Sequence, residues 1–287
     1  MRWQKGRRSH RIEDRRGMKA TGGIGIIGII IVLLGWFMGI NPATLMQFVE
    51  TSGDMTGNHA TSEKTGIPNP ADEVADFTSV ILASSEDAWQ AKFNEHGLKY
   101  RPTTLVTFDN RVRSACGITS SATGPFYCPS DEKIYIDFNF INQMQRMGAQ
   151  GDFAFAYVIA HEVGHHVQNQ LGTLPQAYKI MQSTSQENAN KISVLIELQA
   201  DCYAGIWANY IANGHIQGVS LEQGDLQEGM RAAQAVGDDT ISASAGRSVH
   251  PENFTHGSAS ARQQWLQRGI TYGSLEQCDT FANYRTP

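Results

Sequence analysis

The chain has 287 residues, of which 41% are hydrophobic and 18% are charged, and its formal net charge is -5. A chain of this length and apolar content can bury one sizeable core or two smaller ones, so a compact folded portion is expected. Residues 1–19 hold eight basic and two acidic side chains, which leaves the rest of the chain strongly acidic. Because a protein that neutralises phosphates needs a basic face, this composition argues against nucleic-acid binding.

The first predicted element is a membrane helix over residues 21–40, TGGIGIIGIIIVLLGWFMGI, which contain no charged side chain. A helix of this length spans the roughly 30 Å hydrocarbon core of a bilayer. Residues 1–20 form a basic arm before it, so the positive-inside rule places the N-terminus in the cytoplasm and the rest of the chain outside, in the periplasm or at the cell surface. A cleaved signal peptide is the alternative, but the apolar run exceeds an h-region of about 7–15 residues and no A-x-A-like site follows closely.

Residues 41–70 are predicted to be a flexible linker, because their second half is rich in Gly, Thr, Ser and Pro and carries few apolar side chains. Residues 71–287 are then the folded domain. The apolar spacing near its start predicts one or two helices, and the segments TLVTF and KIYIDFNF are typical of strands. Beyond them the chain is almost entirely helical, so the predicted class is α+β, mostly helical with a small sheet and preceded by one transmembrane helix.

Four cysteines lie beyond residue 40 and permit three pairings, which fits an oxidising compartment. Cys116 and Cys128 flank a short turn region, which suggests a local pair. Cys202 and Cys278 would then join the C-terminal tail to a helix. Four free buried thiols are the alternative, and they agree less well with the predicted compartment.

The helix predicted from Asp152 to Gly172 contains the sequence HEVGH. His161 and His165 are four residues apart, so both rings project from one face toward a single ion. Glu162 lies about 100° around the helix and can reach a water on that ion. This H-E-x-x-H spacing supplies two zinc ligands and a general base. The alternative is that His161 and His165 are structural histidines. A third metal ligand elsewhere in the chain would count against this alternative.

The next helix, predicted from Thr184 to the pair Asn213-Gly214, offers that ligand. In its mostly apolar second part only Glu197 and Asp201 are charged, and their spacing of four puts them on one face. A buried carboxylate is costly without a partner, so we expect Glu197 to bind the same zinc ion and Asp201 to accept the Nδ1 proton of a ligating histidine. The alternative is that both carboxylates cap loops or pair with arginine.

His256 precedes a helix predicted over residues 259–270 and is a candidate to stabilise an oxyanion. A structural loop histidine is the alternative reading. Tyr203 and Tyr272 are lesser candidates for the same role. His166 lies about 140° around the helix from His161, so it is expected to be a structural or surface residue rather than a ligand.

HEVGH followed by ELQAD resembles the gluzincin group of metallopeptidases, in which a Glu-x-x-x-Asp motif supplies the third ligand and its helper. The start MRWQ…EDRR, the block ACG…GPFYCP…KIYIDFNF, the segment ELQADCYAGIWA and the segment FTHGSASARQQWLQRG are together similar to the bacterial membrane-anchored neutral zinc metallopeptidases of the YpfJ type. The resemblance covers nearly the whole chain. It implies a zincin-like catalytic domain in which KIYIDFNF is the edge strand that pairs with an extended substrate.

The combined expectation is a membrane-anchored zinc metallopeptidase, an endopeptidase or a related amide hydrolase, that binds one Zn²⁺ and acts on peptide or protein substrates. Glu162 would act as the general base, and His256 would help the metal to hold the oxyanion. Two alternatives remain: a zinc-stabilised interaction module at the cell surface, and an amidase of cell-wall peptides. The enzyme is favoured because structural zinc sites use four protein ligands and have no need of Glu162.

Overall fold

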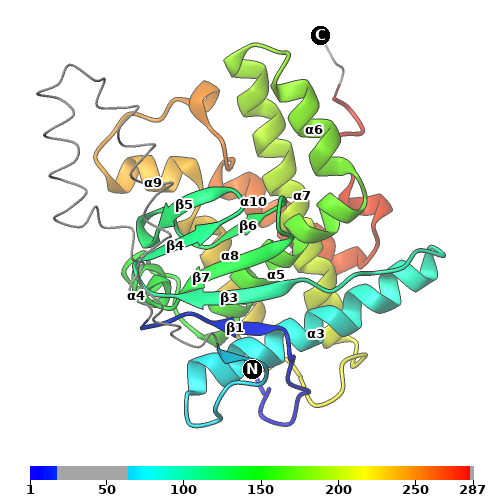
Figure 1. The fold of residues 1–287 in the computed structure, drawn as a ribbon. Coiled ribbons are helices and arrows are strands. Elements are labelled where there is room, and N and C mark those ends of the chain that lie inside the picture. Colours follow the sequence, from blue (N-terminus) through cyan, green and yellow to red (C-terminus); the bar gives the residue numbers. More distant parts are fainter. Residues whose placement is uncertain (18–63, 285–287) are drawn as a thin grey trace, which may run out of the picture.

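The computed structural model describes residues 1–17 and 64–284. In this part of the chain a five-stranded sheet packs against helices, and a two-stranded hairpin follows one of its strands (Figure 1). The strands are β1 (Ile12–Asp14), β2 (Lys64–Thr65), β3 (Thr104–Phe108), β4 (Arg111–Ser114), β5 (Gly117–Ser120), β6 (Phe126–Cys128) and β7 (Lys133–Asp137). The α-helices are α3 (Glu73–Glu95), α4 (Asn139–Arg146), α5 (Asp152–Gln170), α6 (Thr173–Met181), α7 (Gln186–Ala212), α8 (Asp225–Ala235), α9 (Asp238–Ser244) and α10 (Ala259–Tyr272). The predicted α+β class, mostly helical with a small sheet, is confirmed.

The order of the strands in the sheet is β2-β1-β3-β7-β6. Strand β3 runs parallel to both β1 and β7, and β6 is antiparallel to β7, with Cys128 opposite Lys133. The expectation that KIYIDFNF forms the edge strand is therefore wrong, since β7 lies inside the sheet and β6 flanks it. The strand also ends early: the backbone N–H of Asn139 donates to Asp137 at 2.9 Å, and α4 begins there.

The two central helices form close to their predicted positions. Helix α5 starts at Asp152, and Gly172 follows its end with a φ of 82°, a left-handed conformation that favours glycine. The N-cap of helix α7 is one residue later than predicted: it is Ser185, whose side chain accepts the backbone N–H of Asn188. Helix α10 begins after Ser258 as predicted. Helix α5 contacts β6 and β7 on the sheet and α3, α7 and α8 among the helices, so it lies at the centre of the core.

Both predicted disulfides are confirmed. Cys116 bonds to Cys128 and joins the turn between β4 and β5 to β6. Cys202 bonds to Cys278, and both residues are fully buried. This second bond holds the C-terminal tail against α7, one residue after Asp201.

Residues 1–17 belong to the same fold as the domain, which corrects the prediction of a separate arm at residues 1–20 and a domain that starts at residue 71. Strand β1 lies between β2 and β3 in the sheet, next to β3 in Figure 1. The Trp3 ring is buried and packs edge-on against Phe77 of α3, with ring centroids 5.2 Å apart. Apolar side chains in this segment therefore complete the core, although its overall composition is basic.

The charged groups of this segment have partners on the domain. The Arg8 guanidinium makes two contacts with the buried Asp76 carboxylate, at 2.6 and 2.9 Å. The amino group of Met1 lies 3.0 Å from Asp152 and 3.2 Å from Asp225. Burial lowers the pKa of this amino group, but these two carboxylates raise it more, so that it stays above its ordinary value.

The predicted membrane helix at residues 21–40 and most of the predicted linker at residues 41–70 lie outside the described residues. None of the helices within residues 1–17 and 64–284 combines the length and the hydropathy that a bilayer crossing requires.

The packing of the N-terminal segment generates a first prediction. Because Trp3 fills space against Phe77, Trp3→Ala should lower the free energy of unfolding by about 3–5 kcal/mol. Chemical denaturation of the full chain, followed by near-UV circular dichroism, measures this loss. His10→Ala changes an exposed residue of the same segment and should leave the midpoint almost unchanged. Equal midpoints for both variants would show that the segment adds nothing to the core.

Candidate metal centre

The structure brings the three predicted metal ligands together at the contact between α5 and α7. His161 Nε2 lies 3.2 Å from one Glu197 oxygen, and His165 Nε2 lies 3.5 Å from the other. One ligand atom from each of the three residues lies within 4.8 Å of the other two. Tetrahedral zinc with bonds of about 2.0–2.1 Å separates its ligand atoms by about 3.3 Å, so the arrangement fits one zinc ion.

A glycine lets the two helices approach closely enough for this geometry. Gly164 is the fourth residue of HEVGH, and a Cβ atom built there would lie 3.0 Å from the Ala200 carbonyl oxygen and 3.2 Å from the Ala200 Cα. Any side chain at this position would push α7 away from α5. Because Ala200 lies between Glu197 and Asp201 on α7, the close contact carries both carboxylates to the histidines.

Each histidine has a partner on its second ring nitrogen. The Asp201 carboxylate, which is fully buried, lies 2.8 Å from His161 Nδ1. This is the role predicted for Asp201. The Gln168 side-chain oxygen lies 2.9 Å from His165 Nδ1, and the amide group of Gln168 donates to the Ile196 carbonyl on α7. With both Nδ1 atoms engaged, both Nε2 atoms are directed to the same point beside Glu197.

Arg262, which the sequence reasoning did not single out, also reaches this centre from α10. Its guanidinium contacts both oxygens of Asp201, at 2.8 and 2.9 Å. The same side chain lies 3.3 Å from the Tyr157 hydroxyl and 3.9 Å from Glu197. Only 3% of Arg262 is exposed, so a buried cation faces the buried carboxylates.

Glu162 is buried beside the ligands, and one of its carboxylate oxygens lacks a hydrogen bond within the described residues. That oxygen is Oε2. Burial raises the pKa of Glu162, against the opposing effect of the two histidines. A buried carboxylate oxygen without a partner is costly, which is the situation expected of a group that interacts with a bound water or substrate.

The charged groups around the candidate ligands favour the binding of a cation. Burial would raise the pKa of Glu197, but His165 and His161 hold it well below its ordinary value. Burial would likewise lower the pKa of His161, yet Asp201 and Glu197 raise it to about 10. Arg262 offsets one of the three carboxylate charges contributed by Glu162, Glu197 and Asp201. A dication would offset the other two, so the donor set fits Zn²⁺ in charge as well as in geometry.

The remaining candidates are placed differently. His256 is more than half exposed, and its Nδ1 lies 3.2 Å from Asp238, so its described bonds do not reach the ligands. The hydrogen bond to Asp238, with a further contribution from Glu197, raises the pKa of His256. His166 is buried, with its Nδ1 2.9 Å from the Tyr127 hydroxyl of β6, and so it joins α5 to the sheet, in accord with the structural role expected for it.

The two tyrosines named as lesser candidates do not contribute to the centre. Tyr203 is buried in the core next to Trp89, with ring centroids 5.3 Å apart. Tyr272 is 58% exposed at the end of α10. Two other tyrosines interact with the site. The Tyr157 hydroxyl donates to Asp201, and the pKa of Tyr178 on α6 is raised by burial and, further, by Glu197.

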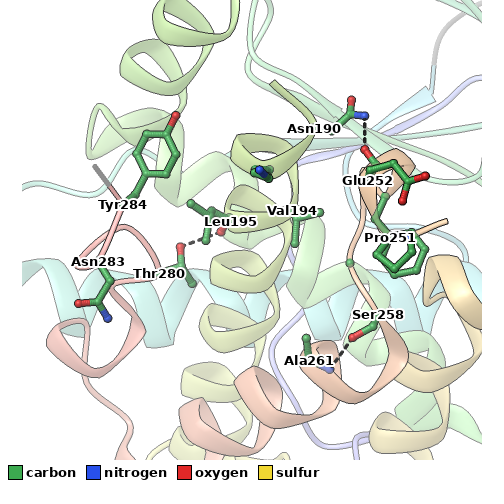
Figure 2. A pocket seen from close by; sticks show the side chains of 13 residues that line it. Asn190, Val194, Leu195, Pro251, Glu252, Ser258, Ala261, Thr280, Asn283 and Tyr284 are labelled. Atoms are coloured by element: carbon green, nitrogen blue, oxygen red, sulfur yellow. Dashed lines mark hydrogen bonds between the residues drawn. The ribbon is translucent and has the colours of Figure 1, made fainter. Parts of the chain in front are cut away.

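A cavity of about 640 Å³ lies beside this centre and shares α7 with it (Figure 2). Its lining includes Asn190 and Val194 of α7, Pro251 and Ser258 before α10, and Thr280 and Tyr284 of the C-terminal tail. The Asn190 side chain donates to the Glu252 carbonyl at 2.9 Å, a bond drawn in Figure 2. None of the candidate ligands lines this cavity, so it is distinct from the metal centre.

The ligand geometry generates a second prediction. Glu197→Gln removes a ligand and should sharply lower the zinc content of the purified protein, whereas Glu162→Gln should leave it nearly intact. Elemental analysis of both variants after dialysis against a trace of zinc measures the difference. Equal loss of zinc from the two variants would contradict the roles given to these two glutamates.

Comparisons with known proteins agree with this centre. The family model described as "Putative neutral zinc metallopeptidase" matches residues 1–281. The chain is 42% identical over 296 aligned residues to the uncharacterized protein YpfJ of Escherichia coli K12, covering 98% of this chain and 99% of that protein. It is 40% identical over 191 residues to an uncharacterized protein of Mycobacterium tuberculosis H37Rv, covering 64% of each chain.

No solved structure matches the chain. The family match runs from the N-terminal segment to the C-terminal tail and includes the three clustered ligands, Glu162 and Arg262. The chain therefore belongs to the family of neutral zinc metallopeptidases that this model describes.

Proposed function

We propose that this chain is a zinc-dependent metallopeptidase that hydrolyses peptide bonds in peptide or protein substrates. The observation that carries the proposal is the unpartnered, buried Oε2 atom of Glu162, which follows directly after the ligand His161. A structural zinc site uses four protein ligands and has no need of such a carboxylate. Membership of a zinc metallopeptidase family supports the same class of reaction.

His161, His165 and Glu197 are the residues that would hold the zinc ion. When bound, zinc supplies a Lewis acid that acidifies a water molecule and polarises the scissile carbonyl. Glu162 accepts the proton of the attacking water and then delivers it to the leaving amine. Its raised pKa helps with the first step, because a carboxylate with a higher pKa is a stronger base toward the attacking water.

His256 is proposed to assist from the side of α10. The Asp238 carboxylate raises the pKa of the imidazole, so the cationic form persists above the ordinary value of 6.5. A cationic imidazole can stabilise the oxyanion that develops on the substrate. Glu197 raises the pKa of His256 electrostatically, which is compatible with a place for His256 at the rim of the site.

The location of the domain is also proposed on chemical grounds. Two disulfides are characteristic of proteins in oxidising compartments, so we propose that the domain is extracytoplasmic. Attachment to the membrane through residues 21–40 stays a prediction from the sequence.

The test of the proposed function uses the purified full chain, because residues 1–17 complete the fold. A diverse peptide library is incubated with the protein, and cleavage sites are identified by mass spectrometry with and without chelator. We expect cleavage that chelation abolishes. On any substrate found, Glu162→Gln should lower the turnover rate by about 10²–10⁴-fold, and His256→Ala should lower kcat with little change in KM.

The matched control is Glu187→Gln, which changes an exposed glutamate at the start of α7 that pairs with Lys191. It should leave both kcat and KM unchanged. Full turnover by the Glu162→Gln variant would refute the proposed mechanism. Unchanged kcat in the His256→Ala variant would return His256 to a structural role.

A further inference from the structure

Arg262 is held more firmly than a simple charge partner needs to be. Its Nε and Nη2 atoms engage the two Asp201 oxygens separately, at 2.8 and 2.9 Å, and its Nη1 atom donates to the Val236 carbonyl at 3.4 Å. This bidentate arrangement fixes the plane of the carboxylate as well as its charge. The contact joins α10 to α7 across 61 residues of sequence.

The Asp201 oxygen that faces Arg262 Nη2 also faces the metal ligand. Asp201 Oδ1 accepts from the Tyr157 hydroxyl, lies 2.8 Å from His161 Nδ1 and contacts Arg262 at 2.9 Å. The direction of the His161 ring therefore depends on the direction of the carboxylate, and Arg262 sets that direction. A lysine could supply the charge but not two parallel hydrogen bonds.

We infer that Arg262 is a positioning residue for the zinc site, which acts through Asp201 to hold His161 in its ligating orientation. The inference rests on the proposed zinc site and adds a partner from a third helix. Groups that support zinc-binding histidines in this way commonly change metal affinity by about 10–100-fold when they are replaced.

The experiment compares Arg262→Lys with Arg268→Lys. Arg268 is an exposed arginine of the same helix whose guanidinium hydrogen-bonds to Gln277 and lies over the rings of Trp265 and Tyr272. Zinc affinity is measured by competition with a chromophoric chelator, and the ligand geometry is read from the visible spectrum after substitution with Co²⁺. Arg262→Lys should bind zinc about 10–100-fold more weakly and shift the Co²⁺ bands. Arg268→Lys should match the wild type in both measurements.

Asp201→Asn keeps the shape of the side chain and interrupts the same contact from the carboxylate side, so the double variant with Arg262→Lys shows whether the two residues act through one contact. Asp201→Asn alone should show a comparable loss of zinc affinity, and the loss in the double variant should be smaller than the sum of the two single losses. Wild-type zinc affinity and an unchanged Co²⁺ spectrum in Arg262→Lys, even with a lower melting temperature, would overturn the positioning role. A wild-type chain that binds no zinc would instead refute the zinc site on which the inference rests.

The pairing of β1 and β2 in the sheet bears on the membrane topology of the chain. Strand β1 pairs in parallel with β3 over residues 12–14 and is antiparallel to β2, with Asp14 opposite Lys64. Asp14 and Lys64, at the ends of the two strands that precede and follow residues 18–63, therefore lie side by side in the sheet. A helix at residues 21–40 that crossed a bilayer once would place these two ends on opposite faces.

Several of the basic side chains that the positive-inside rule counts also contact the domain. Arg7 contacts Glu86 and Asp87 at 2.8 and 2.7 Å, and Arg16 contacts Asp72 at 2.7 Å. We infer that residues 1–17 and 64–284 share one compartment, so that residues 21–40 do not separate the N-terminus from the domain. This inference does not depend on zinc or on catalysis.

Single cysteines in the full chain test it. His10→Cys and Arg247→Cys lie at exposed positions of the two segments, and the four native cysteines are disulfide-bonded and provide an unreactive background. Spheroplasts that express each variant are treated with a membrane-impermeant maleimide before and after permeabilisation. Both positions should respond alike, either both labelled from outside or both labelled only after permeabilisation. Labelling of one position from outside and protection of the other would overturn the inference.

Discussion

A chain of charge-assisted hydrogen bonds runs from His161 through Asp201 to Arg262 and joins three helices that are distant in the sequence. Each of these groups would be costly to bury alone, since an uncompensated charge in the core destabilises a protein by several kcal/mol. Together they satisfy one another, so α5, α7 and α10 can be positioned only in the arrangement that completes the chain. The candidate metal centre lies at its His161 end, and its geometry is a consequence of how the helices pack.

Two further features hold the helices at the distance that this chain of bonds requires. Gly164 removes the side chain that would separate α5 from α7. The disulfide between Cys202 and Cys278 lies one residue beyond Asp201 and fixes the tail behind α7. The Gln199 amide also donates to the Cys278 carbonyl at 3.1 Å, so the tail is joined to α7 by a polar contact as well as by the covalent bond.

The sequence predicts the ligands well because their signal is local. A spacing of four residues places two side chains on one face of a helix, and this holds for both HEVGH and ELQAD. The sequence also contains weaker indications that Gln168 and Arg262 belong to the site. Gln168 lies three residues after His165 on the same helix, and Arg262 occupies a core position of α10 in the series Ala259, Arg262, Leu266, Gly269, all of them buried. A charged side chain within such a stripe indicates a buried partner, but the sequence does not show that the partner is Asp201.

The predictions that were wrong concern the edge strand and the N-terminal segment, where the pairing partners lie far apart in the sequence. Composition identifies β3 and β7 as strands, yet nothing within KIYIDFNF shows that β6 would pair beside it. The N-terminal segment is basic overall, and its charge hides Trp3 and Ile12, both of which are buried. Arg7, Arg8 and Arg16 each have a carboxylate partner on α3 or at its cap, about 60 to 80 residues further along the chain. A count of local charges therefore treats as free several basic groups that the fold neutralises.

The position of β1 within the sheet also constrains the order in which the chain can fold. Asp14 pairs with Thr107, 93 residues away, and the backbone of Arg2 bonds to Ser220. During synthesis, residues 1–17 therefore cannot complete these contacts until Ser220 has left the ribosome. Contacts of such long range close large loops and are among the slowest to form. Until these contacts form, Trp3 and Ile12 lack their places in the core, and apolar side chains exposed in this way favour aggregation of a partly folded chain.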